Sequence, residues 1–269
     1  MKFKLIFLLF NILILLSFGI VIIMPVMILG TDYSINLWSN TWYLPALFIL
    51  IIIAIDGYFF MNWQLFSLLE SENWAELLGF LEEKVLQKEC VRVSYVRTYI
   101  QTCLVTGQVR KIEALESLLR KKRPGLLRKF ALELGMPKVL HKDHADMVSF
   151  YSEFTDQRVP RREWVRFLHA FGMLMQQEHS DGREKLLSLS KTVKEPLLKV
   201  LVLYTLEPFR AVDSEVLEQV DQQKSEMRNS RTKLQFEKDL SRRKDNVAMV
   251  VMTPLIKDAI AWLFAYDEG

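Results

Sequence analysis

Four side chains of the kind that bind metal ions lie within one stretch of six residues. They are His141, Asp143, His144 and Asp146. Imidazole nitrogens and carboxylate oxygens are common ligands of zinc. Histidine and aspartate are also ordinary residues of a turn between two helices, and neither a cysteine nor an HExxH pattern accompanies this group. We therefore predict a structural turn at these positions, with no metal and no other cofactor bound.

The patterns that typify other catalytic sites do not occur in the sequence. It contains no GxxxxGK[ST] or GxGxxG phosphate-binding loop and no GxSxG nucleophile turn. His169 lies among apolar residues of an expected helix, which is typical of a partly buried structural histidine. The two cysteines, Cys90 and Cys103, form no CxxC pair, which excludes a disulfide scaffold and a zinc ribbon and fits a reducing compartment. The sequence therefore predicts a protein that is not an enzyme.

An acidic residue, Asp56, lies inside an apolar segment of the chain. A charge deep in a bilayer costs a few kcal/mol, so such residues often mark a path for ions or protons. Asp56 is five residues from the end of its segment, or about 7.5 Å along a helix, where it can reach interfacial water or bond Asn11 or Ser17. We favour a structural role. An ion- or proton-coupled accessory subunit or membrane-embedded enzyme that uses Asp56 is the alternative.

Two apolar segments, residues 5–29 and 44–61, are long enough to cross a bilayer as helices. The connector between them contains no lysine or arginine, whereas lysines precede the first segment and follow the second. The positive-inside rule therefore predicts a hairpin of two spans with both termini in the cytoplasm. The start, MKFK, resembles the basic region of a signal peptide, but the apolar run is too long and lacks a small-x-small cleavage site. The compact hairpin favours a bacterial inner membrane.

Three prolines divide the middle of the chain at equal intervals of 36 residues: Pro124, Pro160 and Pro196. An apolar pattern at i, i+3 and i+7 follows each proline, and an earlier copy lacks the proline. Residues at this spacing share one face of a helix. The four sets are Val93, Val96 and Ile100; Leu127, Phe130 and Leu134; Trp164, Phe167 and Phe171; and Leu197, Val200 and Tyr204.

A turn and a second apolar-faced helix complete each of the first three copies. The turns are expected at residues 105–108, 141–146 and 179–182. Two copies share a Gly-Met pair, at Gly135 and Gly172, where a small residue would let paired helices approach closely. Pro124 thus opens one unit of a helix–turn–helix repeat. The second helices carry Val109, Ile112, Leu115 and Leu119; Met147, Phe150, Tyr151 and Phe154; and Leu186, Leu187, Leu189 and Val193.

At these positions the chain resembles the tetratricopeptide-repeat (TPR) superfamily over about residues 63–210. Trp164, Phe167 and Phe171 match the large positions of the family pattern W-x2-L-G-x2-Y, and Pro160 and Pro196 match its terminal proline. Leu168 stands where the family has glycine, and the units vary in length. The resemblance implies an all-α solenoid, whose concave side offers residues of the first helices to a protein partner. An irregular helical bundle is the alternative. The partner-binding candidates are Arg97, Gln101, Arg128, Lys138, Arg166 and Gln176.

The segments before and after the repeats suggest three regions: a transmembrane hairpin at 1–62, a TPR-like domain at 63–210 and a C-terminal part at 211–269. At the first boundary Trp63, Phe66 and Leu69 have the spacing of a further first helix, with a break and N-cap at 71–73. Residues 213–245 predict a long charged helix, on which Val220, Met227 and Leu234 form a thin seam. Residues 247–266 predict a capping helix that covers an end of the solenoid or lies against its inner groove.

Positive charge is concentrated in residues 88–170, which contain 17 Lys and Arg and 9 Asp and Glu. Such a face can rest on anionic lipid head groups, dock an acidic protein or simply be solvated. No interleaved aromatic residues accompany the charges, so nucleic acid is not an expected partner. The densest patch is Arg120, Lys121, Lys122, Arg123, Arg128 and Lys129.

The sequence as a whole favours a membrane-anchored scaffold or adaptor that binds protein partners within a larger membrane-associated assembly. The partners that it implies are one or more proteins and the lipid bilayer. The scaffold has two alternatives: the Asp56 hypothesis given above, and a sensor of anionic lipid surfaces that acts through the basic face.

Overall fold

The computed structural model describes residues 2–242 and 247–265, and these residues form helices and turns without any β-strand. The chain divides into two compact units, Met1–Leu81 and Glu82–Gly269, called unit 1 and unit 2 below. The all-α prediction is confirmed for the residues that are described. The division after Leu81 lies within the segment that the sequence assigns to the repeats.

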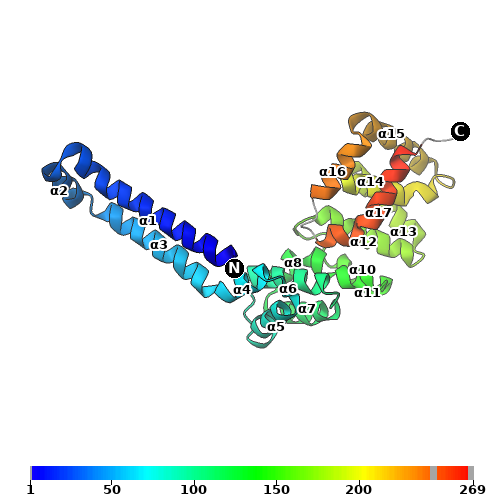
Figure 1. Cartoon of the computed structure of the whole chain (residues 1–269). Helices are drawn as coiled ribbons and strands as arrows, with labels where there is room; N and C mark the ends of the chain where they lie inside the picture. Colours follow the sequence, from blue (N-terminus) through cyan, green and yellow to red (C-terminus); the bar gives the residue numbers. More distant parts are fainter. Residues whose placement is uncertain (1, 243–246, 266–269) are drawn as a thin grey trace. The chain divides into compact units, whose positions relative to one another are not determined.

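Unit 1 is built on a hairpin of two long apolar helices. Its helices are α1 (Lys2–Leu29), α2 (Thr31–Asn40), α3 (Tyr43–Met61), α4 (Trp63–Glu70) and α5 (Trp74–Glu82). Figure 1 shows α1 and α3 side by side along their length. Two ring pairs join them: Phe18 and Phe48 are stacked with centroids 4.8 Å apart, and Phe7 and Phe59 are tilted with centroids 5.4 Å apart. Aromatic contacts therefore hold the two helices together.

The apolar side chains of α1 and α3 have almost no protein around them. Residues Leu5–Ile28 and Tyr43–Met61 are both long and apolar enough to cross a membrane, and none of either stretch is buried inside the protein. An apolar helix that is exposed all round is unfavourable in water, since each apolar side chain left in water forgoes about 1.5–3 kcal/mol. These two helices match the two predicted spans.

The connector between the long helices is itself helical, which the sequence did not predict. Gly30 ends α1 with φ 86°, a left-handed conformation that glycine adopts without steric cost. The short helix α2 then begins at Thr31, and the Ser34 hydroxyl donates to the Gly30 carbonyl at 2.7 Å. A single glycine therefore lets the chain leave one helix and start the next.

The predicted helix break at 71–73 is confirmed. Helix α4 ends at Glu70, and the Asn73 side-chain oxygen accepts a hydrogen bond from the Glu76 amide at 3.3 Å, as an N-cap does. Leu77, Leu78 and Leu81 of α5 are buried. One residue, Asn62, separates α3 from α4.

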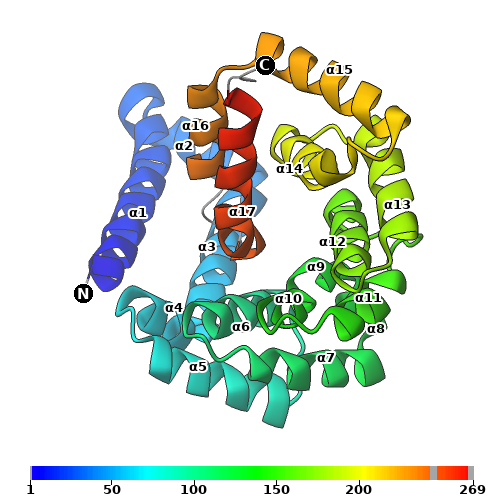
Figure 2. The ribbon, with the colours of Figure 1, turned by 90° about the vertical axis from the view of Figure 1, so that its right-hand side faces the viewer.

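Unit 2 consists of successive helices joined by short turns. Figure 2 shows α11, α12, α13 and α14 following one another in chain order, and each packs against the next. The helices are α6 (Val93–Val105), α7 (Arg110–Lys122), α8 (Pro124–Lys129), α9 (Ala131–Leu134), α10 (Met136–Leu140), α11 (His144–Ser152), α12 (Arg162–Met175), α13 (His179–Thr192), α14 (Pro196–Leu206), α15 (Ser214–Ser230), α16 (Lys233–Arg242) and α17 (Val247–Phe264), with a π-turn at Glu83–Gln87 and a 3₁₀ turn at Glu207–Phe209.

The three evenly spaced prolines do lie at helix starts. Pro124 and Pro196 are the first residues of α8 and α14, and Pro160 comes two residues before α12. Trp164 and Phe167 are buried, and the Trp164 indole nitrogen donates to the Glu195 carboxylate at 2.7 Å. One expected core residue, Val93, is instead exposed, because it is the first residue of α6.

The second copy departs from the predicted single first helix. Its residues form three short helices, α8, α9 and α10, separated at Phe130 and Gly135. Phe130 has φ −110° and ψ 19°, which interrupts the α-helical geometry. The interruption redirects the chain, so that α9 presents Leu132 and Glu133 to a cavity described below.

The two Gly-Met pairs mark close approaches between helices, as predicted. A Cβ atom on Gly135 would lie 2.4 Å from the ring and hydroxyl of Tyr151 in α11. A Cβ atom on Gly172 in α12 would lie 2.9 Å from Val148 of α11. Tyr151 is fully buried, and its hydroxyl donates to the Leu132 carbonyl at 3.0 Å. Helix α11 therefore packs closely on two sides, against Gly135 and Gly172, where only glycine fits.

The predicted long charged helix is two helices, and its apolar seam is interrupted. Helix α15 ends at Ser230 and α16 begins at Lys233. Val220 and Met227 are buried, whereas Leu234 is exposed, because the break rotates it away from their face. Residues 243–245 of that predicted segment lie outside the described residues.

The last described helix, α17, packs against the interior of unit 2. It contacts α14, α15 and α16, and also α9 and α10 from much earlier in the chain. The Lys224 ammonium lies 4.7 Å from the centre of the Trp262 ring, and the Arg228 guanidinium donates to the carbonyls of Leu263 and Ala265. Its buried residues share one face: Met249, Met252, Ile256, Ala259, Ile260 and Leu263. Residue 266 of the predicted segment lies outside the described range.

Replacing Gly135 with alanine should destabilise unit 2 because the added methyl group would overlap the buried Tyr151 ring. Overpacking of this kind costs about 1–3 kcal/mol. The matched control is Gly125→Ala in α8, where nothing lies within 4 Å of the new atom. Thermal unfolding of the full chain in detergent should show a lower Tm for Gly135→Ala and an unchanged or higher Tm for Gly125→Ala. Equal Tm values would contradict the close packing.

Candidate functional site

The residues with metal-binding chemistry at 141–146 cap a helix. Asp143 precedes α11, and its side-chain oxygen accepts a hydrogen bond from the Asp146 amide at 3.1 Å. The described residues contain no group of three or more His, Cys, Asp or Glu side chains placed to hold a metal ion. Helix capping therefore accounts for Asp143 at this turn.

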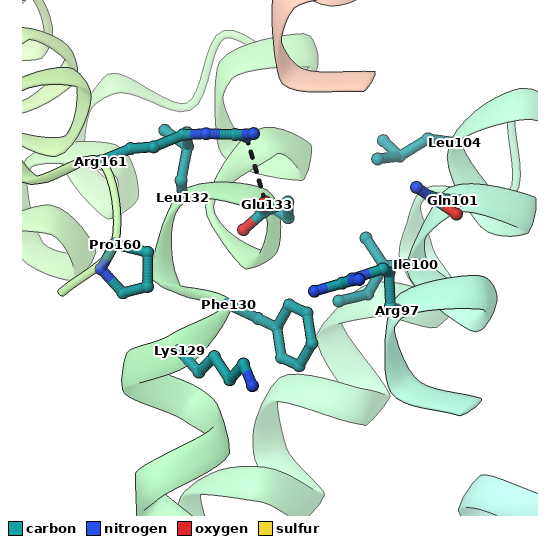
Figure 3. A pocket seen from close by; sticks show the side chains of 10 residues that line it. All are labelled: Arg97, Ile100, Gln101, Leu104, Lys129, Phe130, Leu132, Glu133, Pro160 and Arg161. Atoms are coloured by element: carbon teal, nitrogen blue, oxygen red, sulfur yellow. Dashed lines mark ion pairs between the residues drawn. The ribbon is translucent and has the colours of Figure 1, made fainter. Parts of the chain in front are cut away.

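A cavity of about 350 Å³ in unit 2 is the strongest candidate for a binding site. It lies among α6, α8, α9 and the turn before α12, as Figure 3 shows. We call it the Arg97 pocket. Its lining residues are Arg97, Ile100, Gln101, Leu104, Lys129, Phe130, Leu132, Glu133, Pro160 and Arg161.

The Arg97 pocket has an apolar floor and a cationic rim. Ile100, Phe130 and Leu132 are almost fully buried. Arg97 and Lys129 are exposed, and Figure 3 shows them pointing toward Phe130 from opposite sides. Neither makes an ion pair with a residue that the structure describes. Their charges are therefore available to a ligand that also covers apolar surface.

Glu133 is the one carboxylate in the pocket lining, and Arg161 faces it. The Arg161 Nη1 and Glu133 Oε1 atoms are 3.6 Å apart (Figure 3). Burial raises the pKa of Glu133 above its ordinary value, while its own backbone amide and the charges of Arg161 and Arg97 act in the opposite direction. The pocket thus combines three cations with one carboxyl group that is difficult to ionise.

The backbone at Arg161 is held in the left-handed region, with φ 54° and ψ 42°. This conformation costs a non-glycine residue about 1–2 kcal/mol, so the surrounding structure must enforce it. The Arg161 carbonyl accepts hydrogen bonds from the amides of Trp164 at 2.9 Å and Val165 at 3.3 Å, which starts α12. The hydrogen bonds that start α12 therefore fix the backbone of Arg161, whose side chain faces Glu133.

Of the six partner-binding candidates, Arg97 and Gln101 meet in the Arg97 pocket, where Lys129 of the predicted basic patch joins them. Arg128 is exposed on α8 outside the lining. Gln176 ends α12, and its backbone amide donates to the carbonyls of Gly172 and Met173. The remaining two candidates, Lys138 and Arg166, lie outside the Arg97 pocket.

Lys138 is engaged inside the fold. Its ammonium lies 2.8 Å from the Glu116 carboxylate, and the two side chains are only 12% and 14% exposed. It also lies 4.9 Å from the centre of the Phe150 ring. Lys138 therefore joins α7, α10 and α11 and is not presented as a free charge.

The predicted basic patch is partly neutralised. Arg120 pairs with Glu116 and Glu153, at 3.1 and 2.7 Å, and Lys122 pairs with Glu89. These acids lie 4 to 33 positions away in the sequence, so the run of basic residues alone does not reveal them. Lys121, Arg123 and Arg128 remain exposed.

Asp56 in unit 1 is half-buried and lines a cavity with Phe7, Ile53, Gly57, Phe60 and Trp63. The expected bonds to Asn11 or Ser17 are absent from the described residues. The Asn11 amide donates to the Phe7 carbonyl at 3.1 Å, and the Ser17 hydroxyl donates to the Leu13 carbonyl at 2.8 Å. Both side chains satisfy their own helix, which leaves Asp56 among apolar groups.

Sequence reasoning missed Glu133 and Arg161. They lie 28 residues apart, outside the i, i+3, i+7 pattern, with α10 and α11 between them in the chain. The one sequence feature that could have pointed to Arg161 was its charge at the position directly after Pro160, which opens a repeat.

Comparison with known proteins places the chain among treponemal sequences. A family model described as "Uncharacterised Treponema protein" matches residues 111–265, from α7 to the end of the described chain. A relative from Treponema pallidum (strain Nichols), described as "Uncharacterized protein", is 27% identical over 230 residues, which cover 81% of this chain and 74% of the relative. No solved structure matches the chain.

Glu133 should give the stability of unit 2 a dependence on pH. Because burial raises its folded-state pKa above 4.5, its contribution is complete below the unfolded-state pKa and is lost as pH rises through the folded-state pKa. Glu133→Gln stays neutral. The Tm of this variant minus that of the wild type should therefore increase between about pH 4.5 and pH 7.

The matched control for this measurement is Glu184→Gln, at an exposed position on α13. Its Tm should keep a nearly constant offset from the wild type over the same range. If Glu133→Gln behaved like this control, or became relatively less stable as pH rose, the assigned effect of burial on Glu133 would be wrong.

Proposed function

We propose that this chain, which belongs to the family described as "Uncharacterised Treponema protein", is a membrane-anchored, non-enzymatic scaffold that binds a protein partner through TPR-like helix pairs. The single observation that carries the proposal is the amphipathic Arg97 pocket of unit 2, in a chain whose unit 1 exposes two long apolar helices. The scaffold keeps its partner at the inner membrane as part of a larger assembly.

The exposed apolar helices α1 and α3 support anchoring in a bilayer. Their side chains are not buried by other parts of the protein, and a bilayer would supply the apolar surroundings that they lack. The connector around α2 carries no basic residue, so it is the part that crosses the membrane most easily. On this basis unit 2 lies in the cytoplasm.

The regular helix pairs of unit 2 support a TPR-like scaffold. Prolines 36 residues apart open or precede α8, α12 and α14, and the large residues Trp164 and Phe167 are buried between neighbouring helices. Stacked helix pairs present one long surface made of many elements, which suits the binding of an extended or helical protein segment.

The lining of the Arg97 pocket indicates the chemistry of the partner segment. An apolar side chain covers Ile100, Phe130 and Leu132, and an adjacent aspartate or glutamate meets Arg97 and Lys129. Aromatic or aliphatic anchors flanked by complementary charge are typical of the centre of protein interfaces. We therefore expect an acidic segment with one large apolar residue.

Reversing the charge of the pocket rim should release the partner without unfolding unit 2. The double variant Arg97→Glu and Lys129→Glu places two negative charges where an acidic segment would bind, so capture should fall at least about 10-fold. The measurement is crosslinking in native membranes followed by quantitative mass spectrometry of the proteins that copurify.

The matched control is Lys121→Glu with Arg123→Glu, which changes the same number of charges at exposed positions outside the pocket. The same discrete partner should be lost with the pocket variant and retained with the control. Equal capture by both would contradict a role for the Arg97 pocket, and equal loss would point to the general basic surface. The Tm of each variant should remain near that of the wild type.

The two-span topology can be tested by labelling single cysteines from one side of the membrane. Ser39→Cys in α2 should react with an impermeant maleimide in spheroplasts, and Ser214→Cys in α15 only after permeabilisation. Both positions are exposed in the structure, so protein burial does not confound the comparison. The background carries Cys90→Ser, since Cys103 is buried. Labelling of both positions from the same side would exclude the two-span arrangement.

A further inference from the structure

A second cavity of unit 2, of about 250 Å³, is lined almost entirely by polar side chains. It lies where α12, α13 and the turn after α11 meet, and shares no residue with the Arg97 pocket. We call it the His169 cavity. Its lining residues are Thr155, Asp156, Arg166, His169, Lys185, Ser188, Leu189 and Thr192.

The Arg166 guanidinium is held in a fixed position beside this cavity. Its Nε donates to the Thr155 carbonyl at 3.1 Å, and Arg162 donates to the same carbonyl at 2.8 Å. Because one nitrogen is tied to the backbone, the two terminal nitrogens of Arg166 keep a fixed direction. A fixed guanidinium loses little conformational freedom when it binds an anion.

His169 is more than nine-tenths buried and lines the cavity. Its imidazole makes no hydrogen bond with any residue that the structure describes, and its ring nitrogens are not among the fully buried unpaired atoms, so they remain accessible from the cavity. Burial, and then the nearby charge of Lys185, lower the pKa of His169, while Asp156 acts in the opposite direction. A bound ligand would supply the missing partner.

The α13 side of the cavity adds a cation and a hydroxyl group. Lys185 and Ser188 are one turn apart, and neither side chain has an ion pair or hydrogen bond with the described residues; the Ser188 carbonyl accepts from the Thr192 hydroxyl. The one acid of the lining, Asp156, is 93% exposed and lies 3.7–3.8 Å from Arg162 and Arg166. Ion pairs that are so exposed to solvent are weak, so Asp156 does not neutralise the positive charge of the cavity.

We propose that the His169 cavity binds the phosphate group of a small soluble ligand, either inorganic phosphate or a phosphate monoester. Its tetrahedral oxygens accept hydrogen bonds from several directions at once, as donors from two helices require. The Arg97 pocket is less suited to such a dianion, because its acid, Glu133, is only 27% exposed within the lining, whereas Asp156 is 93% exposed to solvent. This proposal is independent of partner binding at that pocket.

The test is the thermal stability of the full chain in detergent as sodium phosphate is added at pH 7, with sodium chloride of equal ionic strength as reference. A ligand that binds the folded state raises Tm in a saturable way. The rise should be about 2–4 °C at five times the dissociation constant. Sulfate, a similar tetrahedral dianion, should act in the same direction. No saturable rise with phosphate over chloride would overturn the proposal.

Lys185→Gln removes one cation from the cavity, and Lys194→Gln removes one from an exposed position outside it. The phosphate response of Lys185→Gln should require about 10-fold more phosphate, while that of Lys194→Gln should match the wild type. Equal responses of the two variants would overturn the assignment to this cavity. Because both positions are exposed, neither change removes a core contact.

A final arm separates a soluble phosphate from a lipid head group. Phosphatidic acid is added to the detergent micelles in place of inorganic phosphate, and glycerol 1-phosphate is added in solution. A Tm rise with the soluble compounds supports the proposal. A rise that occurs only with phosphatidic acid would overturn it in favour of a lipid site.

Discussion

The close packing of α11 against its neighbours determines how the rest of unit 2 is arranged. The buried Tyr151 ring lies against Gly135 on one side, and Val148 lies against Gly172 on the other. Any larger residue at either glycine would push α9 and α10, or α12, away from α11. Glu133 lies on α9, and Arg161 directly precedes α12. The cation and carboxylate of the Arg97 pocket therefore meet only because α11 fixes the distance between the elements that carry them.

Ion pairs decide which of the many basic residues remain available. Lys138 and Arg120 share the Glu116 carboxylate, and the Lys138–Glu116 pair, which is only 12% and 14% exposed, ties α7 to α10. Arg97 and Lys129 have no such partner among the described residues. The unpaired positive charge of this surface is thus smaller than its composition suggests. A partner would be recognised by the position of a few cations, and less by the total charge of the region.

Much of the helical framework could be predicted from local sequence, because the signals are local. Pro124 and Pro196 begin helices, Asn73 and Asp143 cap them, and Gly135 and Gly172 mark close contacts. The pairing of Lys138 could not be predicted in this way, because Glu116 lies 22 positions away and their spacing leaves no periodic pattern. The break between α15 and α16 was missed although it has a local signal: Thr232 and Gln235 cap the start of α16 reciprocally. Of the residues that line the Arg97 pocket, the sequence singled out Arg97 and Gln101, which share a helix face, but not Glu133 and Arg161, which do not.

The return of α17 to α9 and α10 has a consequence for biosynthesis. These contacts join segments separated by more than 100 residues, so they form late and slowly compared with contacts between adjacent helices. During translation the apolar hairpin of unit 1 leaves the ribosome before unit 2, and α9 and α10 remain partly uncovered until α17 has been made. Exposed apolar surface in that interval favours aggregation or binding by a chaperone. A nascent chain of this protein is therefore most vulnerable after its apolar hairpin has emerged and before α17 has.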